Sequence, residues 1–155
     1  MRLSILLLIL LFAQCNTDKN MNDRTTIHAI RLKPGEDLKL SIDAFVAAHH
    51  ITAGWVITAV GSLTQTNIRY ANQPNGAQLK GHFEIVSLTG TLSINGSHIH
   101  TSMSDSTGYT VGGHLLEGNI VYTTVEIVIG ESKQLQFTRE KDGTTPWEEL
   151  QITEK

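Results

Sequence analysis

The sequence contains very little cysteine and no cluster of basic residues. Cys15 is the only cysteine among 155 residues, which excludes an intrachain disulfide, so the fold must depend on its hydrophobic core. The 12 lysines and arginines are scattered along the chain and are outnumbered by 15 acidic residues, giving a net charge of −3. Proteins that neutralise nucleic-acid phosphates carry a basic patch. Nucleic acid is therefore not expected as a partner, although subunits of an oligomer could assemble a local patch.

Several motifs of catalytic and nucleotide-binding proteins are also missing. The chain has no G-x-S-x-G nucleophile elbow, no Walker loop and no G-x-G-x-x-G fingerprint. Nucleophilic catalysis by a serine and binding of a nucleotide therefore have no motif to support them. Hydrophobic residues make up 40% of the chain and charged residues 17%, which fits one globular domain with a core of its own.

The N-terminal residues resemble a targeting segment rather than part of a fold. The apolar run at 3–13 is too short to span a bilayer and has the length of a signal-peptide core. Cys15 and a polar stretch follow directly, an order that resembles a bacterial lipoprotein signal with cleavage before Cys15 and a lipid on its thiol. We expect a signal peptide at 1–14 and a tether at 15–24, and hence an exported lipoprotein anchored in a membrane, on the periplasmic side or in the outer membrane.

Two other interpretations of this segment stay open. An ordinary secretory signal would end in an A-x-A cleavage site, which this sequence does not contain. Translation starting at Met21 would instead give a cytoplasmic product without a lipid.

The remaining sequence predicts an α+β domain at 25–140, one amphipathic helix packed on a mostly antiparallel sheet. The helix is expected at 36–49, where Leu38, Ile42 and Val46 belong to one apolar stripe. His49, near its C-terminus, suits the negative end of the helix dipole. Residues 141–155 are expected to form a polar tail. Strands are predicted at 25–33, 53–60 (ended by Gly61 and Ser62), 66–71, 82–88, 89–94, 98–103, 119–129 and 134–138, with a hairpin turn at Asn95-Gly96.

Three histidines form the best candidate for a chemical site. His98 and His100 are two residues apart, so on a strand both project from the same face. His114 follows Gly112-Gly113, where a turn could bring its side chain back toward the other two. Three imidazoles and a water are the ligands of a catalytic-type zinc site. The alternative is that these histidines take part in hydrogen bonds on a polar sheet face or at a subunit interface.

Four acidic residues are candidates for supporting this site. Asp105 and Glu117 lie near the histidines in sequence, where either could orient an imidazole or act as a general base. Asp105 is equally typical of a turn at 104–108. Glu84 and Glu126 interrupt apolar strands and are candidates if they are buried; otherwise they belong to a solvated face.

Several segments together resemble one known family. Residues 81–90, GHFEIVSLTG, are similar to the signature G-R-F-E-I-L-S-L-x-G of the plants-and-prokaryotes-conserved (PPC) domain. The block from His98 to Gly118, with Gly112-Gly113-His114, resembles the second signature of the family. The resemblance implies an α+β domain assembled as a homotrimer, with metal ligands at His98, His100 and His114. Zinc or another divalent transition metal would be the cofactor.

Two departures from the family pattern bear on function. The chain has no R-G-R-P hook, the element that contacts DNA in the plant members, and His82 stands where the plant motif has arginine. Stand-alone bacterial members are often described as DNA-binding, but their activity is unsettled. We therefore expect a stand-alone, metal-binding trimer that acts as a binding or assembly module. The alternatives are a metal-dependent hydrolase-like enzyme and a cytosolic DNA-associated protein translated from Met21.

Overall fold

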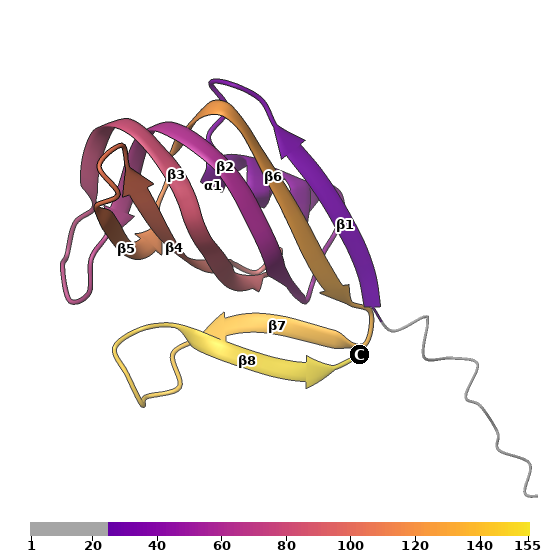
Figure 1. Ribbon diagram of the computed structural model, residues 1–155. Helices are drawn as coiled ribbons and strands as arrows, with labels where there is room; N and C mark the ends of the chain where they lie inside the picture. The colour runs from indigo at the N-terminus through magenta and orange to yellow at the C-terminus, as the bar shows by residue number, and fades with distance from the viewer. Residues whose placement is uncertain (1–24) are drawn as a thin grey trace, which may run out of the picture.

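The computed structural model describes residues 25–155, which form one helix and eight strands (Figure 1). Within this part of the chain, no helix has the length and apolar character needed to cross a membrane. The expected signal peptide, tether and lipidated Cys15 lie outside the described residues. The elements in chain order are β1 (Thr25–Leu32), α1 (Leu38–Ala48), β2 (Gly54–Arg69), β3 (Ala77–Leu92), β4 (His98–Asp105), β5 (Thr110–Leu115), β6 (Ile120–Ser132), β7 (Leu135–Glu140) and β8 (Glu149–Glu154).

The first six strands form one antiparallel sheet in the order β1-β6-β2-β3-β4-β5. Strand β5 also pairs with the end of β2, at Ile68↔Leu115 and Arg69↔His114, so that strands β2 to β5 close on themselves. Figure 1 shows the resulting strong curvature of β2 and β3. The closure matters for function because it brings the end of β2 beside β4 and β5.

Helix α1 lies behind β2 and β6 in the view of Figure 1. Asp37 caps its N-terminus, where one carboxylate oxygen accepts hydrogen bonds from the backbone N–H groups of Lys39 and Leu40. The predicted apolar stripe is confirmed, because Leu38, Ile42 and Val46 are fully buried or nearly so. The helix begins two residues later than predicted, since Asp37 is its cap and Glu36 lies before it.

The core lies between α1 and the sheet, and its side chains come from alternate positions on the strands, as the pleat requires. Burying this apolar surface is the main source of stability in a chain without disulfides. Fully buried strand residues include Leu63, Leu92, Met103, Val125 and Ile129.

Strands β2 and β3 are much longer than predicted. The predicted stop at Gly61-Ser62 is wrong, because β2 continues through it with irregular pairing to β6 between Gly61 and Leu63. The two strands predicted at 82–88 and 89–94 are one strand, with a register shift between Ile85 and Ser87. β-Bulges of this kind bend a strand without ending it. The hairpin predicted at Asn95-Gly96 is confirmed by the pairing of β3 with β4.

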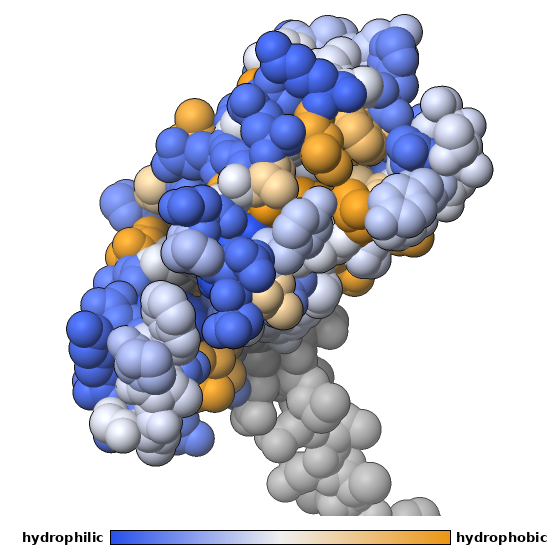
Figure 2. Space-filling model, turned by 90° about the vertical axis from the view of Figure 1, so that its left-hand side faces the viewer, coloured by the Kyte–Doolittle hydropathy of each residue, from blue (hydrophilic) through white to orange (hydrophobic). Residues whose placement is uncertain are grey.

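The C-terminal residues are not only a polar tail. Residues 149–154 form β8, which pairs along its whole length with β7. Backbone and side-chain hydrogen bonds link β7 to two loops at the end of the main sheet. Phe137 N–H donates to Thr52 O, before β2, and Asn95 Nδ2, between β3 and β4, donates to Phe137 O. Figure 1 shows this hairpin along the lower edge of the sheet, below β4 and β5. Figure 2 shows the side of the molecule that lies at the left in Figure 1. On this side small apolar groups lie among hydrophilic residues.

Candidate metal centre

The three predicted histidines lie together on neighbouring strands. His98 and His100 are alternate residues of β4, so both project from the face opposite the buried Ile99. His114 lies on β5, directly opposite His100 in the antiparallel register. The prediction of a turn at Gly112-Gly113 is wrong, since both glycines belong to β5, and strand pairing rather than a turn positions His114.

Glycines permit the close strand packing behind this cluster. A Cβ on Gly90 of β3 would lie 2.2 Å from the carbonyl oxygen of His98, and one on Gly113 would lie 2.5 Å from that of Arg69. Any larger residue would push β3 away from β4, or β5 away from β2. In the sequence these glycines resemble residues that end a strand. In the structure they allow the strands that carry the histidines to pack closely against their neighbours.

One ring nitrogen of each histidine points toward a common position, so the three nitrogens lie close together. His98 Nε2 lies 3.1 Å from His100 Nε2 and 3.0 Å from His114 Nδ1, and the third separation is 3.2 Å. Each nitrogen of a neutral imidazole is either a donor or an acceptor. Among three nitrogens in mutual contact at least one pair must therefore be of the same kind, so hydrogen bonds alone cannot satisfy the cluster. A cation satisfies it, because it can accept all three lone pairs together.

The spacing also fits a metal ion. Ligand nitrogens 2.0–2.1 Å from a zinc ion lie about 3.3–3.4 Å apart in a tetrahedral site and about 2.8–3.0 Å apart in an octahedral one. The observed separations of 3.0–3.2 Å fall between these values. Within residues 25–155 these histidines are the one group of three or more potential ligand residues whose ligand atoms converge. An all-imidazole set suits zinc, copper, iron or nickel, and not calcium or magnesium.

The electrostatic environment favours the neutral form of two of the rings. Partial burial, followed by the charges of His100 and Arg139, lowers the pKa of His98. Partial burial, followed by the charge of Arg69, lowers the pKa of His114. Metal binding requires the neutral ring, so both shifts reduce competition from protons near neutral pH.

The four acidic candidates do not join the cluster. None shares a hydrogen bond with His98, His100 or His114 among the described residues. Asp105 accepts hydrogen bonds from the Thr107 hydroxyl and from the backbone N–H groups of Thr107 and Tyr109, the turn role that the sequence also allowed. The Thr107 hydroxyl, followed by the backbone donors, lowers the pKa of Asp105. The other three, Glu84, Glu117 and Glu126, are exposed.

Two arginines and a tryptophan near the cluster were missed from the sequence. Arg139 of β7 donates from Nη2 to Thr91 Oγ1 at 2.7 Å, and Thr91 is the register partner of His98. Arg69 ends β2 opposite His114, and its guanidinium lies 5.8 Å from the ring centre of Trp147. No local signal could have identified them, because the closure of the sheet and the docking of the β7–β8 hairpin bring them to the site.

A second polar cluster lies away from the histidine centre. Glu131 of β6 is only 3% exposed and accepts hydrogen bonds from His28 (2.9 Å) and Lys133 (2.7 Å). Burial opposes its ionisation, but these two partners outweigh burial and lower its pKa. The ring of His28 also packs edge-on against Phe45 of α1. This cluster therefore ties β1, β6 and α1 together, and its carboxylate is satisfied.

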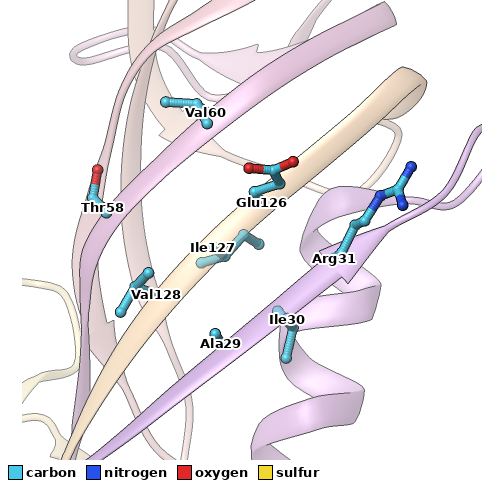
Figure 3. Close-up of a pocket in the computed structure, with 8 residues that line it drawn as sticks. All are labelled: Ala29, Ile30, Arg31, Thr58, Val60, Glu126, Ile127 and Val128. Atoms are coloured by element: carbon cyan, nitrogen blue, oxygen red, sulfur yellow. The ribbon is translucent and has the colours of Figure 1, made fainter.

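A shallow hollow of about 400 Å³ lies on the outer face of β1, β6 and β2 (Figure 3). Strand register places Arg31, Glu126 and Val60 in one row across this face. Ala29, Val128 and Thr58 form the next row. Val60 is 57% exposed, and Ile27, Ile57, Val86 and Tyr122 are exposed as well. Ile27 of β1, Tyr122 of β6 and Val60 of β2 therefore give this face exposed apolar side chains on three adjacent strands.

The fold and the site together define a class of protein. Its members have a curved antiparallel sheet packed with one helix, and adjacent strands of the sheet carry a cluster of three histidines. The model of the Plants and Prokaryotes Conserved domain, abbreviated PCC or PPC, matches residues 20–133. The chain belongs to this family. The match ends before β7, so the hairpin that contributes Arg139 and Trp147 lies beyond the matched segment.

Individual relatives agree with this assignment. A hypothetical protein from Salmonella enterica is 39% identical, with a TM-score of 0.83 over 84% of this chain and 95% of that one. A metal-containing protein from Archaeoglobus fulgidus is 25% identical, with a TM-score of 0.70 over 81% of this chain and 93% of that one. The bifunctional protein GlmU of a Synechococcus strain is 40% identical over 81% of this chain, which spans only 20% of GlmU.

Proposed function

We propose that this PPC-domain protein binds one divalent transition metal ion per chain through His98, His100 and His114. The observation that carries the proposal is the meeting of three imidazole nitrogens at separations of 3.0–3.2 Å. The metal-containing relative from Archaeoglobus fulgidus adds support. Zinc is the metal we favour among those that imidazole ligands suit. The metal would organise a binding or assembly module.

Elemental mass spectrometry of the full-length protein, purified without a histidine tag, tests this proposal. We expect about one metal ion per chain in the wild type and none in the His98→Ala/His114→Ala variant. The matched control is His49→Ala/His50→Ala, which removes two exposed histidines at the end of α1 and should keep the metal. The proposal fails if the wild type carries no metal, or if both double variants retain it equally.

A hydrolase-like enzyme is the alternative use of the same centre. Three protein ligands leave a coordination position for water, as in catalytic zinc sites, where the metal makes bound water acidic. The absence of a hydrogen bond between the histidines and any of the four acidic candidates favours the module. Hydrolysis of model phosphate esters or carboxylate esters by the metal-loaded protein, lost in the His98→Ala/His114→Ala variant, would favour the enzyme instead.

We further propose that the chain assembles as a homotrimer through the outer face of β1, β6 and β2. The exposed apolar side chains on this face support the proposal, because contiguous apolar surface on a folded protein is typical of an interface. The adjacent rows of Val60 with Glu126 and Thr58 with Val128 give the face both apolar and charged elements.

Export and lipid anchoring are also proposed, with the lipid on Cys15. The apolar run at 3–13 followed by Cys15 supports this location. Mass spectrometry of the N-terminal peptide should find a lipid-modified Cys15 as the first residue. An unmodified product that begins at Met21 would contradict the proposal and favour the cytosolic alternative. Binding of that product to duplex DNA should then weaken steeply with salt.

A further inference from the structure

Two guanidinium groups lie beside the histidine centre without acidic partners. The three ion pairs among residues 25–155 involve histidine or lysine, and none includes an arginine. Arg139 donates to Thr91 Oγ1, and its Nε is the one buried side-chain polar atom in this part of the chain that has no hydrogen-bond partner. Unsatisfied donors of this kind point to a partner that completes the site.

Arg69 approaches the centre from the other side. It lies directly opposite His114 in the register of β2 and β5, so the two side chains share one face of the sheet. Its guanidinium lies 5.8 Å from the ring centre of Trp147, which is 66% exposed and belongs to the loop between β7 and β8. This cation–π contact orients the guanidinium without neutralising its charge.

The charges of the loaded centre do not balance. Three neutral imidazoles leave the full double charge on a divalent ion, which becomes the largest local charge. Arg139 adds a positive charge beside His98, because it donates to Thr91, the register partner of His98. Arg69 adds another beside His114, its register partner. Glu149 of β8 is the one carboxylate whose charge acts on His98. Positive charge therefore stays in excess, and an anionic ligand would relieve it.

We propose that the metal-loaded centre binds a small oxyanion, the carboxylate or phosphate group of its ligand, with Arg139 and Arg69 as the residues that recognise it. The inference rests on the proposed metal binding. The planar fork of an arginine matches both oxyanions, and a metal with three protein ligands has a position for one oxygen. A shallow depression of about 220 Å³ accommodates a small ligand, and its lining residues are Thr89, Gly90, Thr91, His98 and His100.

The hairpin β7–β8 thereby gains a role in recognition. It supplies Arg139 from β7 and, through Trp147, the stacking contact that orients Arg69. Hydrogen bonds from Arg139 to Thr91 and from Asn95 to the carbonyl of Phe137 hold β7 at the edge of the depression. The segment beyond the family match would then determine which anions the centre accepts.

Anion titrations of the full-length protein loaded with Co²⁺ test the inference, because visible d–d absorption reports both metal loading and ligand exchange at the metal. The probes are inorganic phosphate and succinate, each added at constant ionic strength. The variants are Arg139→Gln and Arg69→Gln, with Lys80→Gln as the control. Lys80 is an exposed lysine of β3, far along the strand from Thr91 and outside the proposed assembly face.

We expect at least one probe to shift the Co²⁺ spectrum of the wild type, and whichever binds more tightly identifies the ligand as a phosphate or a carboxylate. Arg139→Gln and Arg69→Gln should keep the metal but bind that probe about tenfold more weakly, the effect of losing one charged hydrogen bond. Lys80→Gln should match the wild type. No spectral change with either probe, or equal affinity in all four proteins, overturns the inference. A wild type without Co²⁺ absorption is a different failure, since the metal proposal and this inference then fail together.

Discussion

At the scale of single residues, the important property of the site is the lowered pKa of two of its histidines, His98 and His114. Burial lowers the pKa of His98 and of His114, and nearby positive charges lower both further. Rings that stay neutral at pH 7 offer their lone pairs to a metal without first losing a proton. The same shifts make the metal-free protein sensitive to acid.

The sign of this acid sensitivity follows from the direction of the shifts. Above about pH 6.5, the ordinary pKa of histidine, both rings are neutral in the folded and the unfolded chain. Below it the unfolded chain binds protons that the folded cluster resists, so the free energy of unfolding falls as the pH drops toward the lowered folded pKa. After metal removal with a chelator, the urea midpoint should fall between about pH 7.5 and 5.5. The fall should be smaller in the His98→Ala/His114→Ala variant, and an equal fall in both proteins would contradict this account.

At the scale of elements, the N-cap of α1 joins the helix to the loop before β6. Asp37 accepts hydrogen bonds from two N–H groups of the first turn and, through its other oxygen, from the backbone N–H of Gly118. The cap therefore fixes the start of the helix and the end of the segment that carries His114.

Replacement of Asp37 by alanine should lower the free energy of unfolding by about 1–2 kcal/mol, the usual cost of losing a cap. Urea denaturation measures it. Asp43→Ala is the control, because Asp43 forms only a partly exposed i,i+4 pair with Lys39 and should change stability by about 0.5 kcal/mol or less. Equal losses in the two variants would show that the cap has no special role.

The sequence carried enough information to predict elements with a strong local period. Leu38, Ile42 and Val46 are four residues apart, which places them on one face of a helix, and His98 and His100 are two apart, which places them on one face of a strand. The structure has both arrangements, because each depends only on local spacing. The resemblance to the PPC family predicted the fold and is confirmed by the match over residues 20–133.

Features that depend on distant contacts were predicted poorly. Gly112 and Gly113 resemble a turn locally, yet they lie within β5, because neighbouring strands approach too closely for larger residues. Arg69 and Arg139 reach the histidines only through strand pairing and hairpin docking between residues far apart in sequence. The spacing of charged or apolar residues within a short stretch of sequence does not predict contacts between distant segments.

At the scale of the whole molecule, the outer face of β1, β6 and β2 is the surface most suited to self-association. Val60 of β2 belongs to this face and lies in the register row of Arg31 and Glu126. A charge at this position would have to be desolvated or paired on association, which is costly inside an apolar interface.

If the chain assembles as the proposed homotrimer, Val60→Glu should dissociate it, as measured by sedimentation velocity. The control is Ile152→Glu on β8, because Ile152 is 59% exposed and Val60 57%, but Ile152 lies outside this face. The control should stay trimeric. A monomeric wild type, or a trimeric Val60→Glu variant that remains folded, would rule out assembly through this surface.

The central claim, a metal held by three histidines, is tested most directly by anomalous X-ray diffraction from crystals of the protein, collected on both sides of the metal absorption edge. The account predicts one anomalous peak per chain, 2.0–2.1 Å from Nε2 of His98, Nε2 of His100 and Nδ1 of His114, for zinc. A crystal that contains metal elsewhere, or rings that turn apart and bind only water, would contradict it.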